Sequence, residues 1–360
     1  MKWKTFLCCI IIIASSSVIG IVGIEDGQGN MQNSCEFPMS EIDASGLTIE
    51  IEKEPQRIVS LAPSASQTMW EIGGSEKIIG VTHYAEYLEG ADEKEVISSL
   101  EGEIILENVV SLEPDLVLAP SIIPEKTVEK LREAGLIVYY SSELSTIEDI
   151  IEETRLIGRL SGECEGAEEV IEWMESTLNG IYRGEGISEG AHNGESPTIL
   201  YVFYGWTAGD GTLIDEVIEM AGAKNSAKLM GIEGYRQLNK ELIVEGKPEW
   251  IMINSDEVEG IKNDEIIQKS NASMNGRVIV VEVEHLNQPA PRIVLAIEKI
   301  SQEIYQEYNT GGKKQLPSER NSDGSDISSI EAISSEPYMQ FIILTGFVIL
   351  VIGLTMYKKE

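Results

Sequence analysis

The sequence predicts an α/β protein with two βα lobes that contain mainly parallel sheets, a long connecting helix, and a C-terminal transmembrane helix. Three observations predict this fold. Short apolar runs alternate with helical stretches in two regions, a purely helical pattern separates these regions, and a long uncharged run lies near the C-terminus. Strands that alternate with helices form βα units, whose sheets are largely parallel.

The composition is that of a globular and strongly acidic protein. Of 360 residues, 42% are hydrophobic and 24% charged, and 27 Lys and Arg face 61 Asp and Glu. The resulting formal charge of −34 argues against a nucleic-acid partner, because phosphate binding requires a Lys/Arg surface. Cys8 and Cys9 lie in the N-terminal apolar run, so only Cys35 and Cys164 remain in the body of the chain. The sequence leaves their pairing open.

Residues 1–30 are predicted to be an export signal. The basic start, Met1 to Lys4, precedes 20 uncharged residues, Thr5 to Ile24. This is the arrangement of a signal peptide, although an uncleaved span has the same pattern. The body of the protein is therefore expected on the outer side of a membrane.

Residues 36–145 form the predicted N-terminal lobe. Pro63 and Ser64 open a helix, with Ser64 as its N-cap, and Gly73 and Gly74 end it. The other elements follow from apolar runs and from glycine or proline at their ends. The predicted strands are 57–61, 78–81, 114–119 and 136–140, and the predicted helices are 63–72, 106–111 and 124–134.

Residues 146–185 are predicted to connect the lobes as helix. Apolar residues recur at helical spacing, and Gly162 and Gly166 interrupt the pattern, leaving a second helix of about twenty residues that is roughly 30 Å long. A helix of this length is a stiff connector, so we expect only a small closure of the lobes. The cleft between them should lie at the C-terminal ends of their strands.

Residues 195–310 form the predicted C-terminal lobe, which repeats the scheme of the first. Its predicted strands are 198–203, 250–254 and 277–282, and its predicted helices are 213–221 and 293–305.

The C-terminal part predicts a tethered protein. Residues 311–337 are rich in serine and predict a flexible linker. Residues 338–357 contain no charge and are long enough to span a bilayer. Lys358 and Lys359 follow and predict a cytoplasmic C-terminus. The expected location is the cell membrane, with a single-pass anchor and the lobes outside. A C-terminal anchor is typical of a cell without an outer membrane, such as an archaeal one.

Several segments resemble the ABC-importer solute-binding proteins for vitamin B12 and iron–siderophores. They are RIVSLAPS at 57–64, IGVTHY at 79–84, LEPDLVL at 112–118, TAGDGTLIDE at 207–216 and APRIVL at 290–295. The likeness covers roughly residues 55–308, in the family's order. It implies two βα lobes, a long connecting helix and a ligand held between the lobes without chemical change.

The resemblance also implies ligand-binding residues. Matching aromatic side chains are Tyr84, Trp206 and Tyr235, and flat rings suit a broad, partly apolar ligand. The B12-binding members carry two further tryptophans where this chain has Leu100 and Pro120, so we expect a less aromatic pocket. His285 is considered as an axial metal ligand, and Arg292 is expected to pair with a carboxylate of the protein. The expected ligand-binding set is Ser64, Tyr84, Trp206, Tyr235, Arg236, Glu284, His285 and Gln288, beside Asn287 in the same loop.

The resemblance implies partners as well. One glutamate on each lobe of the family docks on the permease, and Glu107 and Glu241 hold these positions. Acids near the start of a helix also complement its dipole, which is the alternative explanation. The expected partners are an ABC permease with its ATPase and a small metal chelate, with no resident cofactor or metal.

The favoured chelate is a corrinoid, and a ferric siderophore or haem is the alternative. A receptor ectodomain and an anchored enzyme are the rival classes, but no catalytic motif is found in the sequence.

Overall fold

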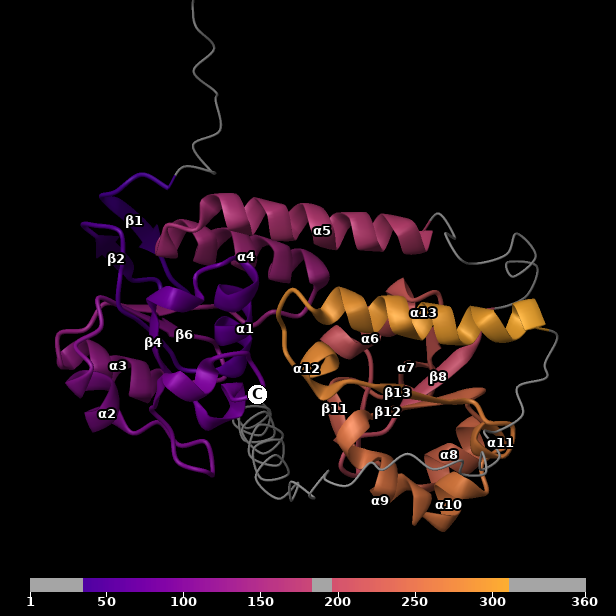
Figure 1. Cartoon of the computed structure of the whole chain (residues 1–360). Helices are drawn as coiled ribbons and strands as arrows, with labels where there is room; N and C mark the ends of the chain where they lie inside the picture. Colours follow the sequence, from indigo (N-terminus) through magenta and orange to yellow (C-terminus); the bar gives the residue numbers. More distant parts are fainter. Residues whose placement is uncertain (1–34, 183–195, 311–360) are drawn as a thin grey trace, which may run out of the picture. The chain divides into compact units, whose positions relative to one another are not determined.

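Two parallel sheets form the centres of two lobes in the computed structural model, which describes residues 35–182 and 196–310. These residues belong to one compact unit. Figure 1 shows the N-terminal lobe in indigo and purple and the C-terminal lobe in pink and orange. The prediction of an α/β protein built on parallel sheets is confirmed.

The sheet of the N-terminal lobe has five parallel strands in the order β5-β4-β3-β6-β7. The central strands are buried along their whole length, as expected for a parallel sheet that helices cover on both faces. The strands are β3 (Ile58–Ser60), β4 (Ile78–Val81), β5 (Glu95–Val96), β6 (Leu116–Ala119) and β7 (Val138–Tyr140). The helices are α1 (Pro63–Glu71), α2 (Leu106–Ser111) and α3 (Glu125–Glu133), with short 3-10 turns at Ser75–Lys77, His83–Ala85 and Ala91–Glu93.

Helix α1 begins differently from the prediction. Its N-cap is Ala62, whose side chain cannot cap, and Pro63 is the first helical residue. Proline fits this position because its missing N–H would have no partner in the first turn and its φ is already helical. The assignment of Ser64 as N-cap is therefore wrong by two positions. The end is as predicted, with Gly73 in the left-handed region at φ 83°.

The connecting segment consists of α4 (Ile147–Ser161) and α5 (Cys164–Tyr182), which pack against each other and lie side by side in Figure 1. Thr146 accepts a hydrogen bond from the backbone of Asp149, whose side chain accepts one in return, so a capping box starts α4. Gly162 ends α4 in the left-handed conformation, at φ 83°, as the sequence predicted. The connector is therefore a helical hairpin whose second helix has 19 residues. The expectation that Gly166 also interrupts the helix is wrong, because Gly166 lies inside α5.

The sheet of the C-terminal lobe has four parallel strands in the order β10-β8-β12-β13. These strands are β8 (Thr198–Tyr201), β10 (Lys224–Asn225), β12 (Trp250–Asn254) and β13 (Val278–Val281). The longer helices are α6 (Leu213–Met220) and α13 (Ile293–Thr310), and α13 packs against α5 and α6. The short helices are α7 (Ser226–Leu229), α8 (Glu241–Gly246), α9 (Val258–Lys262), α10 (Glu265–Gln268), α11 (Asn271–Met274) and α12 (Val283–Leu286), with a 3-10 turn at Ser255–Glu257.

Two antiparallel pairs lie beside the main sheets and were missed by the sequence analysis. Strands β1 (Met39–Ile42) and β2 (Thr48–Ile51) form a hairpin before the first lobe, and β9 (Trp206–Ala208) pairs with β11 (Tyr235–Gln237). A disulfide joins Cys35 to Cys164 at the start of α5, which settles the pairing that the sequence left open. It closes a loop over a sequence separation of 129 residues.

Direct contacts also hold the two lobes together. Nε2 of Gln67, on α1, donates to the backbone oxygen of Glu284 over 2.9 Å. Nε of Arg292, at the start of α13, lies 2.7 Å from Oε1 of Glu71 on α1. The expectation that Arg292 pairs with a carboxylate of the protein is thus confirmed.

Within residues 35–182 and 196–310, no helix is both long enough and apolar enough to cross a bilayer. The predicted signal (1–30), linker (311–337) and anchor (338–357) lie outside the described residues.

Candidate ligand-binding site

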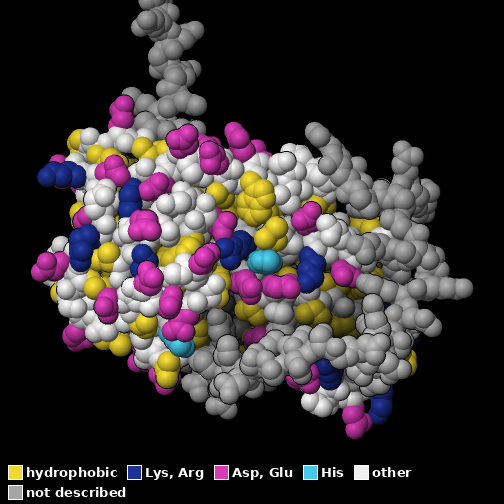
Figure 2. All heavy atoms as spheres, in the orientation of Figure 1, with side chains coloured by type: hydrophobic (Ala, Val, Ile, Leu, Met, Phe, Trp, Pro, Cys, Tyr) yellow, Lys and Arg dark blue, Asp and Glu magenta, His cyan; other side chains and the backbone are white. Residues whose placement is uncertain are grey.

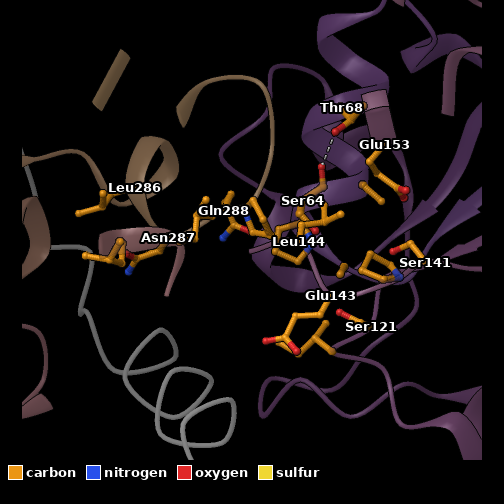
Figure 3. A pocket seen from close by; sticks show the side chains of 18 of the residues that line it. Ser64, Thr68, Ser121, Ser141, Glu143, Leu144, Glu153, Leu286, Asn287 and Gln288 are labelled. Carbon is orange, nitrogen blue, oxygen red and sulfur yellow. Dashed lines mark hydrogen bonds between the residues drawn. The ribbon is translucent and has the colours of Figure 1, made fainter. Parts of the chain in front are cut away.

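A cavity of about 260 Å³ lies between the lobes and is lined by residues from both. The lining residues follow β3, β4, β6 and β7 in the first lobe and β8 and β13 in the second. The C-terminal ends of both parallel sheets therefore meet at this cavity, where open α/β sheets bind ligands. The prediction of a cleft at these strand ends is confirmed. Figure 3 shows polar side chains from both sides of the cavity.

Four aromatic side chains of the second lobe form one wall of the cavity: Tyr201, Phe203, Trp206 and Tyr235. The rings of Tyr201 and Phe203 are stacked with centroids 4.8 Å apart, and the ring of Tyr235 meets Phe203 edge-on at 5.9 Å. Trp206 and Tyr235 come from the paired strands β9 and β11. This pairing brings residues 29 positions apart in the sequence to the same wall.

The opposite wall belongs to the first lobe and combines Tyr84 and Pro120 with small polar residues. Tyr84 is 1% exposed, and its hydroxyl donates to the backbone oxygen of Leu100 over 2.9 Å. Ser64 lies in the first turn of α1, where its backbone oxygen accepts a hydrogen bond from Thr68 (Figure 3). Leu100 itself is not among the lining residues and is 62% exposed.

Helix α12 divides the residues of the predicted ligand loop between two faces. Val283, Leu286 and Asn287 line the cavity, and their spacing of three and four residues places them on one face of the helix. Glu284 and His285 lie between them in the sequence and do not line the cavity. Burial lowers the pKa of His285 and so favours the neutral imidazole, although the charges of Glu284 and Glu282 act in the opposite direction. Gln288 follows the helix and lines the cavity.

Arg236 follows Tyr235 in β11, and the structure places it outside the cavity lining. Successive side chains of a strand point to opposite faces, so a strand that turns Tyr235 into the cavity turns Arg236 away from it. Arg236 donates to the backbone oxygen of Tyr235 over 3.1 Å. Five of the eight predicted residues therefore meet at the cavity, namely Ser64, Tyr84, Trp206, Tyr235 and Gln288.

Burial raises the pKa of two tyrosine hydroxyls that line the cavity. It raises the pKa of Tyr235 to about 12, with a further contribution from the charge of Glu143. The pKa of Tyr201 lies well above its usual range, chiefly through burial. The Tyr201 hydroxyl lies 2.8 Å from Oδ1 of Asn254 and 2.9 Å from Oδ1 of Asn287. These contacts hold the Asn287 amide at the edge of the cavity.

Glu143 and Glu153 also line the cavity, and neither was predicted. Burial raises the pKa of Glu153 to about 7, although hydrogen bonds from Tyr139 and Ser141 act in the opposite direction. Phe203 was missed as well, because nothing in the sequence separates it from a core residue. The polar residues Ser141 to Glu143 directly follow the predicted strand 136–140, and this position could have indicated that they line the cavity.

The two expected docking glutamates lie at helix starts, as the sequence indicated. Glu107 is exposed in the first turn of α2. Glu241 is the first residue of α8, and its side chain lies outside the described part of the structure. On the face drawn in Figure 2, acidic side chains outnumber basic ones, in keeping with the overall charge.

The fold and the cavity define a class of protein. This architecture is typical of solute-binding proteins: two lobes with parallel sheets, a helical connector, and an aromatic cavity between the lobes. A family model described as "Periplasmic binding protein" matches residues 58–284. The chain belongs to this family.

Relatives with curated descriptions support the same class. A protein described as cobalamin-binding, from Halobacterium salinarum, is 35% identical over 271 residues, covering 72% of this chain and 72% of its own length. The Bacillus subtilis protein YvrC, described as an uncharacterized ABC transporter substrate-binding lipoprotein, is 25% identical over 85% of this chain and 98% of its own. A vitamin B12-binding protein of Pectobacterium atrosepticum is 25% identical over 69% of this chain and 88% of its own. These relatives are described as binding proteins, not enzymes.

Solved structures share the fold. The periplasmic haem-binding protein RhuT from Roseiflexus superposes with a TM-score of 0.62 at 21% identity, covering 70% of this chain and 98% of that one. The haem-binding protein HmuT superposes with a TM-score of 0.64 at 22% identity, covering 76% of this chain and 91% of that one. At this identity the likeness is one of fold alone.

Proposed function

We propose that the protein is the extracytoplasmic solute-binding component of an ABC importer and that it delivers a corrinoid to the permease. The observation that carries this proposal is the cavity between the lobes, where Trp206, Phe203 and Tyr235 form an aromatic wall that faces Ser64 and Pro120 of the first lobe. Flat aromatic surfaces bind a broad ring at a low cost in conformational entropy. The relatives described as cobalamin- or B12-binding support the corrinoid over other chelates.

The cavity holds the ligand without reacting with it. Ser64, Asn287 and Gln288 supply hydrogen-bonding groups at its edge, suited to the amides that surround a corrin ring. A volume of about 260 Å³ lies just below the usual range for ligand pockets, roughly 300–1,000 Å³. A corrinoid is larger, so we expect the lobes to shift when it binds. The contacts of Gln67 and Arg292 between the lobes keep that shift small.

Delivery requires a surface that the permease recognises. Glu107, exposed at the start of α2, and Glu241, at the start of α8, would supply one acidic contact on each lobe. Charge pairs of this kind steer association and set orientation more than they add affinity. The signal at 1–30 and the anchor at 338–357 would place the lobes outside the membrane, held by the linker at 311–337. The description of YvrC as a lipoprotein agrees with a membrane-attached location.

We expect ligand binding to depend on the ring of Trp206. Titration of the full-length protein with cobinamide or cyanocobalamin, followed by calorimetry, should give saturable 1:1 binding. Trp206→Ala should weaken it roughly 5- to 150-fold, because the ligand loses its stacking surface, worth about 1–3 kcal/mol.

Tyr182→Ala is the matched control, because Tyr182 is an aromatic residue of α5 that is 64% exposed and outside the cavity lining. Its affinity should equal that of the wild type. Absence of corrinoid binding, or equal losses in both variants, would contradict the proposed ligand or its site.

A further inference from the structure

The charged residues that line the cavity are all of one sign. Among its 26 lining residues, all within the described ranges, Glu143 and Glu153 are charged and none is Lys, Arg or His. Arg292 and Arg236, which are close in the sequence to lining residues, do not line the cavity themselves. Arg292 pairs with Glu71, and Arg236 is turned away from the cavity on β11. A ligand in the cavity therefore meets carboxyl groups without a basic partner to balance them.

Glu153 lies at the inner side of the cavity, on α4. Its Oε2 accepts a hydrogen bond from the Tyr139 hydroxyl over 2.8 Å. Its neighbours in the lining include Thr68, Ser141 and Ile157, and Figure 3 shows its side chain between Thr68 and Ser141. The carboxyl group is thus held in place by the protein, beside the small polar residues that line the first-lobe side of the cavity.

Glu143 lies at the rim, in the loop between β7 and α4. Its side chain is exposed, and Figure 3 shows it apart from Glu153. The negative charge of Glu143 helps to raise the pKa of Tyr235 in the other lobe. The charge of Glu143 therefore influences groups across the opening between the lobes, whereas the charge of Glu153 lies in the wall of the first lobe.

We propose that Glu143 and Glu153 make the cavity selective for ring ligands whose edges carry neutral amides or positive charge, and against ligands whose edges carry carboxylates. This inference rests on the proposed function, because it concerns the ligand of the same cavity. Amide N–H groups donate hydrogen bonds to a carboxylate, and these charge-assisted bonds are stronger than those between neutral groups. A ligand carboxylate meets like charge in a partly desolvated site, where repulsion is much less screened than in water.

The two classes of ring differ in this respect. A corrinoid such as cobinamide carries amides around its ring, whereas haem carries two propionates. Cobyrinic acid has the corrin ring with carboxylates in place of the amides, so it provides a probe of edge charge at constant ring shape. The bis-amide of haem provides the converse probe for a porphyrin ring.

The test measures, at pH 8, where Glu153 with its pKa of about 7 is mostly ionised, the affinity of the full-length protein for these two matched pairs, cobinamide against cobyrinic acid and haem bis-amide against haem. In each pair the amide should bind at least tenfold more tightly than the carboxylate. In the double variant Glu143→Gln with Glu153→Gln, the ratio of the affinity for the amide to the affinity for the carboxylate should fall at least fivefold. The main reason is that the carboxylate ligands bind more tightly to this variant.

The matched control is Glu148→Gln, which removes an exposed negative charge from the first turn of α4, outside the cavity lining. It should leave the ratio unchanged and so separates the local effect from that of the overall negative charge.

The outcomes distinguish this inference from the proposed function. Binding of both members of each pair with equal affinity, or a ratio that the double variant does not change, would overturn the inference and leave corrinoid binding intact. Preference for the haem bis-amide without binding of any corrinoid would support the charge selectivity and overturn the proposed ligand. Absence of binding by all four probes would overturn both.

Discussion

At the scale of single residues, Glu153 shows how position changes the chemistry of an ordinary side chain. Burial in the wall of the cavity raises its pKa to about 7, despite the hydrogen bonds from Tyr139 and Ser141. In the unfolded chain its pKa returns to the ordinary value near 4.5. Between these two values the folded protein holds a proton that the unfolded chain has lost. The contribution of Glu153 to stability is therefore most favourable below about pH 4.5 and decreases as the pH rises through 7.

Glu153→Gln should accordingly stabilise the protein at pH 8 and have little effect at pH 5. Glutamine keeps a carbonyl that accepts the Tyr139 hydrogen bond and carries no charge that must be buried. The free energy of unfolding, measured with urea, should be about 1–3 kcal/mol higher than that of the wild type at pH 8.

Glu172→Gln, at an exposed position of α5, serves as the control and should show no such pH dependence. A Glu153→Gln variant that is less stable than the wild type at pH 8 would show that the ionised carboxylate is stabilised by its surroundings.

At the scale of helices and strands, the approach of α5 to α1 depends on Gly166. A Cβ at this position would lie 2.0 Å from the backbone oxygen of Ile72, which follows α1. A backbone atom cannot yield as a flexible side chain can, so the two helices would have to separate. Figure 1 shows how α5 extends from this contact toward the second lobe, where it packs against α13.

Gly166→Ala should therefore lower the free energy of unfolding by about 1–3 kcal/mol, as expected for an overpacked contact, despite the better helix propensity of alanine.

The control is Gly260→Ala in α9, where a Cβ would meet nothing within 4 Å. That variant should be neutral or more stable by up to about 1 kcal/mol, since only the helix propensity changes. Equal effects of the two substitutions in urea unfolding would contradict the close contact at Gly166.

The sequence predicted the longer parallel strands and the longer helices, because buried strands are apolar throughout and amphipathic helices repeat their pattern. It missed β5 and β10, the two-residue strands at one edge of each parallel sheet. It missed β9 and β11, whose three-residue strands carry too few positions for a period, and the hairpin of β1 and β2. It placed Tyr235 and Gln288 in the site through family resemblance. It also named Arg236 and His285, which neighbour lining residues but lie on the other face of their strand or helix. A sequence match cannot resolve this difference of one position.

At the scale of the whole molecule, the site exists because two separate sheets present their C-terminal strand ends to one another. The helical hairpin of α4 and α5, the packing of α13 on α5 and the ion pair of Arg292 with Glu71 hold this arrangement. The disulfide between Cys35 and Cys164 ties the segment before β1 to the start of α5. Neither lobe alone encloses the cavity, so capture of a ligand is a property of the pair.

The most direct test of this account is to locate the cobalt of a bound corrinoid by anomalous diffraction from crystals of the complex. The account predicts a single cobalt position between the lobes, with the ring in contact with Ser64 or Pro120 on one side and with Trp206 or Phe203 on the other. A cobalt position on the outer surface of one lobe, with the space between these residues empty, would contradict it.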